Sequence, residues 1–119
     1  MTLLGDACHP MLPFMAQGAA QALEDGAALT SCLTQDTTRP IPDALALYEA
    51  LRKPRTSRIQ GLSQGNKTRF HLPDGPEQRA RDEQMARGGT DFSFAATEWL
   101  YAHDAADVRP AGQQDSLPQ

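Results

Sequence analysis

The sequence has few of the residues from which a large hydrophobic core or a β-sheet is built. Leu, Ile, Val and Phe account for 20 of its 119 residues, under the roughly one-fifth below which disorder becomes a concern. Val and Ile supply only three of these, whereas Ala is abundant, which favours helices over strands. The net charge of −4 is too small for a highly charged disordered chain. We therefore expect one mainly helical unit with little apolar surface of its own.

Other absences exclude whole classes of protein. No apolar run approaches the roughly 20 residues of a membrane span, and the first ten residues lack the basic and apolar regions of a signal peptide. The acidic composition, with a pI of about 5.2, gives no reason to expect nucleic acid as a partner. The two cysteines, Cys8 and Cys32, form neither a disulfide framework nor a zinc-ligand spacing. We predict a cytoplasmic protein with no metal site.

The pattern predicts three to four helices and one short N-terminal strand. The strand is expected over residues 2–4 and the helices over residues 17–33, 42 to about 65, 77–87 and a last segment opened by Asp91. Pro54 lies inside the second helix and is expected to kink or divide it, and Gly65-Asn66 is expected to end it. Residues 1–104 are predicted to form the folded part, and residues 105–119 a disordered tail.

The first two helices carry narrow apolar stripes. In the first, Ala20, Leu23 and Ala27 are three or four residues apart, and Glu24-Asp25 are expected on the other side. In the second, the expected stripe runs through Leu45, Tyr48, Leu51, Ile59 and Leu62.

The first helix begins without any of the usual capping residues. Ser, Thr, Asp or Asn normally accepts a hydrogen bond from the free N–H groups of a first turn, but the sequence here is Gln17-Gly18-Ala19-Ala20. The small side chains would let a bulky or planar group approach the backbone, and the partial positive charge of a helix start favours an anion or an electron-rich carbonyl. Two interpretations stay open: a ligand caps the helix, or water does.

The stretch "TLLGDACHPMLPFMAQGAAQALEDGAAL" closely resembles the second flavin-contacting motif of class A FAD-dependent aromatic-ring monooxygenases, especially the salicylate hydroxylase-like branch. That family has a strand ending in Gly-Asp, then Ala-x-His-Pro, a further Pro, and Gln-Gly opening a helix that contains Glu-Asp. "YEALRKPRTSRIQGLSQGN" and "WLYAHD" resemble the helices that follow in the family. The resemblance covers residues 1–104 and implies a fragment of an α/β FAD-binding monooxygenase fold.

The resemblance implies roles for residues of the loop before the helix. Asp6 would accept hydrogen bonds from the ribityl hydroxyls of FAD, and Gly5 would let the backbone come close there. The amide of Ala7 would face the pyrophosphate. Pro13 would lie beside the isoalloxazine ring.

The resemblance also supplies a ligand for the uncapped helix. Gln17, Gly18 and Ala19 would direct the helix start at the N1–C2 carbonyl edge of the flavin ring. That edge becomes negative when the flavin is reduced, so the positive helix end would stabilise reduced FAD.

Parts of the family pattern are absent. The sequence has no G-x-G-x-x-G dinucleotide fingerprint and no middle Asp-Gly motif, so the chain resembles the C-terminal part of such an enzyme. The implied parent enzyme reduces FAD with NAD(P)H and uses O₂ to hydroxylate an aromatic substrate. No residue here is a convincing general base, so no catalytic residue is assigned, and we expect the chain alone to be inactive. The missing N-terminal part of the same enzyme is the expected partner. Alternatively, the chain is a non-enzymatic helical remnant or interaction protein that retains the motif.

Three other groups of residues invite a chemical interpretation. Cys8-His9 could be a nucleophile and its base, but neighbours on an extended chain point to opposite faces, so His9 is expected to be structural. Glu24-Asp25 could act as a general acid or base, but they are expected to face a neighbouring element or solvent, with Asp25 fixing nearby backbone. The basic residues at positions 52, 53, 55 and 58 are expected to form a solvated face or ion pairs with acidic residues such as Glu49, rather than a phosphate site.

Overall fold

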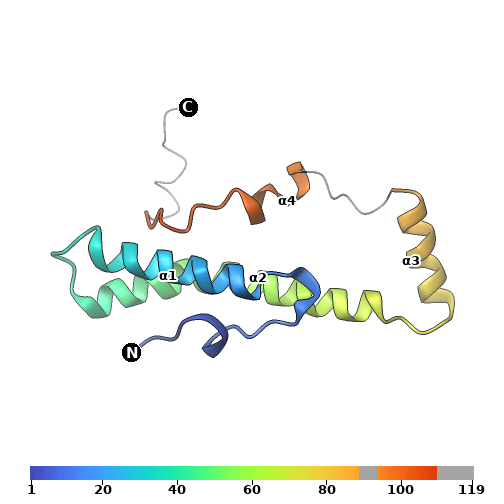
Figure 1. The fold of residues 1–119 in the computed structure, drawn as a ribbon, viewed down its shortest axis with the longest axis horizontal. Coiled ribbons are helices and arrows are strands. Elements are labelled where there is room, and N and C mark those ends of the chain that lie inside the picture. Colours follow the sequence, from blue (N-terminus) through green and yellow to red (C-terminus); the bar gives the residue numbers. More distant parts are fainter. Residues whose placement is uncertain (89–93, 110–119) are drawn as a thin grey trace.

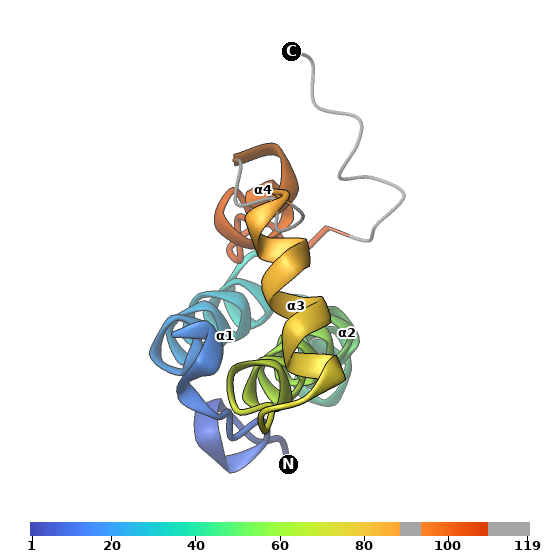
Figure 2. The same ribbon diagram turned by 90° about the vertical axis from the view of Figure 1, so that its right-hand side faces the viewer.

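The computed structural model describes residues 1–88 and 94–109. Two long antiparallel helices form its centre, α1 (Gly18–Thr34) and α2 (Ile41–Phe70), and they lie side by side (Figure 1). The N-terminal segment lies along one side of this pair, and α4 (Phe94–Tyr101) lies along the other (Figure 2). The helix α3 (Pro76–Ala86) follows the far end of α2. The mainly helical fold predicted from the sequence is thus confirmed.

The predicted N-terminal strand is not formed among the described residues. Leu4 has the extended backbone of a strand, with φ −138° and ψ 142°, but no other extended segment of the described chain pairs with it. Instead, the Tyr48 hydroxyl donates to the Leu3 carbonyl at 2.9 Å. A strand needs a neighbouring strand to satisfy its backbone groups, and the described part of the chain supplies none.

Two short 3₁₀ helices occupy the loop between this segment and α1. The first, η1, spans Gly5–Ala7, and the second, η2, spans Pro13–Met15. The first packs against α1 and the second against α2. The loop is therefore attached to both central helices.

The helix α2 is longer than the sequence indicated. It runs unbroken through Pro54, and it continues past Gly65-Asn66 to Phe70; the prediction that Gly65-Asn66 ends it was wrong. Pro54 and the residue four positions earlier, Ala50, are both exposed. The helical hydrogen bond that the proline removes therefore lies on an exposed side of the helix, where its loss is tolerated without a break.

The buried face of α1 is not the predicted apolar stripe. Leu23 is 76% exposed, whereas Asp25 is fully buried. The buried face of α1 therefore includes a position that sequence patterning assigned to the opposite side of the helix. The buried positions of α1 are Gln21, Asp25, Ala28, Ser31 and Cys32. Charged partners on α2, described below, make this polar face the interior one.

The hydrophobic core is small and contains a residue from near the C-terminus. It comprises Ala28, Cys32, Ala44, Tyr48 and Val108, with leucines of α1 and α2 packed around it. The boundary predicted at residue 104 stays a prediction, although Val108 is only 4% exposed. Residues 110–119 lie outside the described residues, as does Asp91, the predicted cap of α4. No helix within the described ranges is long and apolar enough to cross a membrane.

Candidate functional site

The loop that carries the predicted cofactor contacts begins with a tight turn on α1. Gly5 is buried and has φ +64°, a left-handed conformation that is costly for residues with a side chain. A Cβ built on Gly5 would lie 3.4 Å from the Cβ of Ala22. Glycine is therefore required here both by the backbone and by the close approach to α1.

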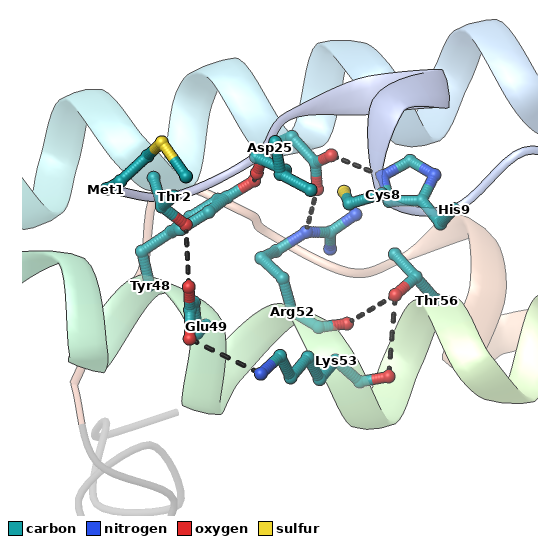
Figure 3. A pocket seen from close by; sticks show the side chains of 11 residues that line it. Met1, Thr2, Cys8, His9, Asp25, Tyr48, Glu49, Arg52, Lys53 and Thr56 are labelled. Carbon is teal, nitrogen blue, oxygen red and sulfur yellow. Dashed lines mark hydrogen bonds and ion pairs between the residues drawn. The ribbon is translucent and has the colours of Figure 1, made fainter.

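The carboxylate of Asp25 anchors this turn. One oxygen, Oδ2, accepts the backbone N–H of Gly5 at 2.9 Å and contacts Nε2 of His9. The other oxygen, Oδ1, accepts Nε–H of Arg52 on α2 at 2.7 Å. These contacts join the loop, α1 and α2 at one point (Figure 3). The prediction that Asp25 fixes nearby backbone is confirmed.

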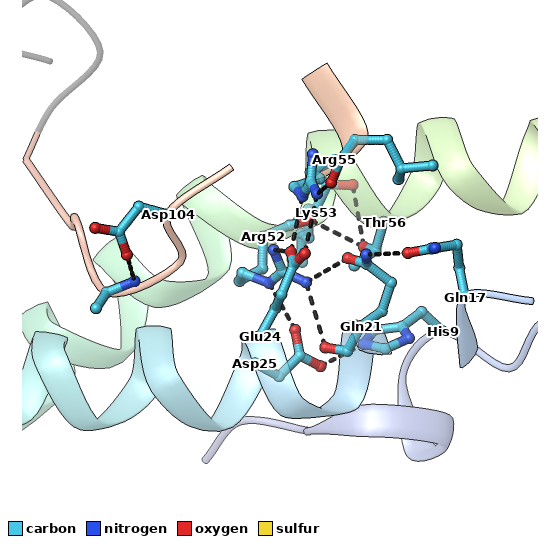
Figure 4. Close-up of polar contacts among 12 residues, drawn as sticks. His9, Gln17, Gln21, Glu24, Asp25, Arg52, Lys53, Arg55, Thr56 and Asp104 are labelled. Carbon is cyan, nitrogen blue, oxygen red and sulfur yellow. Dashed lines mark hydrogen bonds and ion pairs between the residues drawn. The ribbon is translucent and has the colours of Figure 1, made fainter. Parts of the chain in front are cut away.

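A buried network extends from Asp25 to the C-terminal part of the chain. Arg52 also donates to Oε2 of Glu24 at 2.8 Å and to the side chain of Gln21 at 2.7 Å. Glu24 in turn accepts two hydrogen bonds from Arg55 at 2.8 and 3.0 Å. Figure 4 shows this chain of alternating charges across the two helices.

Arg55 continues the network to the end of α4. It donates to the carbonyls of Trp99 and Leu100 at 2.7 and 2.8 Å, so a cation satisfies the C-terminal end of that helix. The guanidinium of Arg58 lies 3.6 Å from the centroid of the Trp99 ring. Of the two interpretations of the basic cluster, ion pairing is correct for residues 52, 53 and 55, and Arg52 is buried rather than solvated.

The network sets the ionisation of its acidic groups. Burial alone would raise the pKa of Asp25, but hydrogen bonds from Arg52, Gly5 and His9 outweigh it and hold this pKa below its ordinary value. Burial likewise opposes the hydrogen bonds and charges of Arg55 and Arg52 at Glu24, whose pKa is also lowered. At Tyr48, burial and the nearby charge of Asp25 raise the pKa to about 12. At neutral pH the centre of the site therefore holds two carboxylates, of Asp25 and Glu24, whose negative charges are balanced by the guanidiniums of Arg52 and Arg55.

The predicted cofactor residues differ in exposure. Gly5 and Gln17 are buried, Gly18 is half-buried, and the remaining predicted residues are exposed, namely Asp6, Ala7, Pro13 and Ala19. The helix α1 begins at Gly18, and among the described residues no side chain caps it. The side chain of Gln17 accepts a hydrogen bond from Gln21 at 3.1 Å, so it is engaged within the protein rather than with the free N–H groups of the helix.

These residues fit a phosphate- and hydroxyl-bearing ligand such as FAD. The carboxylate of Asp6 has no hydrogen-bond partner in the described ranges, which leaves it free to accept hydrogen bonds from the hydroxyl groups of a ligand. A Cβ built on Gly18 would meet nothing within 4 Å, so the start of α1 is open for approach. The uncapped N–H groups there carry the positive end of the helix dipole.

A cavity of about 330 Å³ lies between the N-terminal residues and α2 (Figure 3). Met1, Thr2 and Leu3 line one wall, and Tyr48, Arg52 and Lys53 line the opposite wall. Leu3 is also largely exposed to solvent. Its charged lining is already paired, because Arg52 bonds Asp25 and Glu24 while Lys53 lies 3.3 Å from Glu49.

Cys8 and His9 do not form a nucleophile and base. The Cys8 thiol donates to the Gly5 carbonyl at 3.3 Å, whereas Nε2 of His9 faces Asp25. Burial and the charge of Asp25 raise the pKa of this thiol, which opposes thiolate formation. Ligand atoms of Cys8, His9 and Asp25 lie within 4.8 Å of one another, but both oxygens of Asp25 already have partners, so the cluster is not a built metal site.

Comparison with known proteins identifies the family. Residues 1–62, just over half of the chain, match the family described as "FAD binding domain". The chain is 43% identical over 117 residues to the FAD-dependent monooxygenase OpS4 of Beauveria bassiana, covering 90% of this chain and 27% of that protein. It is 45% identical over 108 residues to 3-amino-4-hydroxybenzoate 2-monooxygenase PtnB3 of Streptomyces platensis, covering 91% and 26%.

A third relative, 6-hydroxynicotinate 3-monooxygenase of Pseudomonas fluorescens, is 54% identical over 66 residues, which cover 56% of this chain and 17% of that protein. The chain belongs to the FAD binding domain family, and its cofactor is FAD. The resemblance to FAD-dependent aromatic monooxygenases is confirmed. The chain spans about a quarter of the length of the first two relatives.

Sequence reasoning missed that Asp25 and Arg52 form the buried centre of the site. The available signal was an acidic pair in one predicted helix and several arginines in the next. Hydrophobic periodicity does not register such a pair, because each residue alone is scored as a surface residue.

Proposed function

We propose that this chain is the C-terminal part of a flavoprotein monooxygenase that hydroxylates an aromatic substrate with NAD(P)H and O₂. When bound, FAD supplies the redox and oxygen chemistry. Support comes from relatives that are named as monooxygenases of 3-amino-4-hydroxybenzoate and 6-hydroxynicotinate. The observation that carries the proposal is the open N-terminus of α1 beside a loop with an unpaired carboxylate.

Each residue of the loop has a proposed role in holding the cofactor. Asp6 accepts hydrogen bonds from the ribityl hydroxyls, and the amide of Ala7 faces the pyrophosphate. Gly5 allows the turn that presents them, in keeping with its φ of +64°. Pro13 lies beside the isoalloxazine ring.

The start of α1 has a proposed electrostatic role. Its free N–H groups, at Gln17, Gly18 and Ala19, face the N1–C2 carbonyl edge of the ring. Because negative charge gathers there on reduction, the helix end favours the reduced cofactor by about 0.3–1 kcal/mol if exposed and up to about 2 kcal/mol if partly buried.

The remaining parts of the active site are proposed to lie outside this chain. No general base is assigned here, and the dinucleotide fingerprint is absent from the sequence. We propose that the N-terminal part of the same enzyme is the partner, that it binds the rest of FAD, and that the enzyme is cytoplasmic. Exposed leucines at positions 3, 4, 12 and 23 offer apolar surface for such a partner.

The test is a titration of the purified chain with FAD, followed by flavin fluorescence, for the wild type and Asp6→Ala. We expect saturable binding in the wild type that Asp6→Ala weakens by about tenfold or more, since a hydrogen bond to a charged acceptor contributes about 1.5–3 kcal/mol. Asp6 is exposed, so the variant should retain the wild-type melting temperature. Equal affinity of the two proteins would refute the role of Asp6.

A second measurement addresses the chain's activity alone. We expect NADH oxidation by the chain with FAD to match a control with free FAD. Oxidation clearly above that control would contradict the proposal that essential parts lie elsewhere.

A further inference from the structure

Three polar side chains on one face of α2 bond the loop between His9 and α1. Nε2 of Gln60 donates to the Pro10 carbonyl at 2.9 Å, and Oγ of Ser63 donates to the Leu12 carbonyl at 2.5 Å. Further along, Nδ2 of Asn66 lies 3.1 Å from Sδ of Met15. The donors are three residues apart, which places them in one row along a helix. We call Gln60, Ser63 and Asn66 the loop clamp.

The loop has few other means of holding its shape. Pro10 and Pro13 have no backbone N–H, and Ala16 N–H reaches only back to the Pro13 carbonyl at 3.0 Å. The helix η2 packs mainly against α2. The position of residues 10–15 is therefore set chiefly by contacts with α2.

Ser63 is the most constrained member of the clamp. It is 1% exposed, and a buried hydroxyl without a partner is costly. A serine inside a helix often bonds a carbonyl of its own preceding turn, but here the donated bond crosses to the loop. A displacement of Leu12 would leave this hydroxyl without that partner, so the bond resists movement of the loop.

We propose that Gln60, Ser63 and Asn66 are positioning residues that hold the loop in the conformation that meets FAD. The proposal rests on the proposed function for the identity of the ligand. Ser63 acts through Leu12, the neighbour of Pro13, and Asn66 acts through Met15, just before the start of α1. Because of the loop clamp, the positions of the loop and of the open N-terminus of α1 depend on the position of α2 along its own axis.

Hydrogen–deuterium exchange of the 119-residue chain tests the clamp without FAD. The variant is Ser63→Ala, and Ser57→Ala, an exposed serine on the same helix, is the matched control. We expect amide exchange over residues 11–17 to rise about fivefold in Ser63→Ala, as expected for loss of one buried hydrogen bond. Exchange around Ala28 and Tyr48 should not change, and Ser57→Ala should match the wild type.

Two exchange results would overturn the proposal. Unchanged exchange over residues 11–17 would mean that the clamp does not hold the loop. An equal rise in the loop and in the α1–α2 core would make Ser63 a general stabiliser instead. If Ser63→Ala fails to fold, Gln60→Met provides the same comparison at a half-buried position.

FAD titration of the same proteins tests the link to the cofactor. We expect FAD to bind about fivefold more weakly to Ser63→Ala than to the wild type, and to bind Ser57→Ala with unchanged affinity. Faster loop exchange with unchanged FAD affinity would refute the positioning role. Absence of binding by the wild type would instead count against FAD binding by this chain alone, while the exchange data would still decide whether the clamp orders the loop.

Discussion

Replacing Asp25 with Ala should destabilise the protein more than any exposed substitution. Asp25 is fully buried, and its carboxylate accepts hydrogen bonds from Gly5 and Arg52 besides its contact with His9. Removing one partner of a buried ion pair typically costs about 3–5 kcal/mol, because the remaining charge is left uncompensated.

The structure places the expected value near the lower end of that range. After the substitution, Arg52 still bonds Glu24 at 2.8 Å and the Gln21 side chain at 2.7 Å, so its charge is not left unpaired. The buried N–H of Gly5 does lose its acceptor, which adds about 1–3 kcal/mol. We expect a total loss of about 3 kcal/mol, a large part of the 5–15 kcal/mol that stabilises a typical domain.

Urea unfolding followed by circular dichroism at 222 nm measures this loss. Asp25→Asn serves as the control, because it keeps the shape and one acceptor oxygen and should lose less than Asp25→Ala. In a double-mutant cycle, Asp25→Ala with Arg52→Met should lose at least about 1 kcal/mol less than the sum of the single variants. A loss under about 1 kcal/mol for Asp25→Ala, or strict additivity in the cycle, would refute the reasoning.

Two further predictions follow from the same region. Gly5→Ala should destabilise the protein by about 1–2 kcal/mol because the residue has a left-handed φ of +64°. Its control, Gly26→Ala, lies inside α1 with nothing within 4 Å of the added Cβ and should stabilise the protein by about 0.5–1 kcal/mol. Equal urea midpoints for the two variants would contradict this. The pKa values of Asp25 and Glu24 are lower in the folded protein, so their stabilisation is complete above about pH 5, where both groups are also ionised in the unfolded chain, and is lost as the pH falls through the folded values. The melting temperature should therefore fall below about pH 5, and this fall should be shallower in Asp25→Asn but unchanged in the exposed control Asp74→Asn. Parallel curves for all three proteins would argue against the network as the cause.

Local features of the chain could be predicted from the sequence because they depend on nearby residues. The expected helices at residues 17–33 and 77–87 correspond to α1 and α3, each displaced by one residue at either end. The uncapped start of α1 follows from the residue types at that position. The flavin motif also lies in one continuous stretch, which is why the family could be identified from it.

The face that each helix buries required the tertiary structure. Leu23 is exposed and Asp25 is buried because Arg52, Gly5 and His9 together satisfy a carboxylate that would otherwise be expelled from the interior. The expected strand at residues 2–4 is not formed because its pairing depends on a segment that the described chain does not contain.

The sequence by itself thus determined the helices, the cofactor motif and the family, all of which are encoded by residues close together in the chain. Only the tertiary structure decided that Asp25 and Arg52 lie at the centre and that Gln60, Ser63 and Asn66 hold the loop. Those bonds join residues 27 to 51 positions apart. A polar side chain is buried only where another element supplies its partner, and local patterning carries no information about that partner.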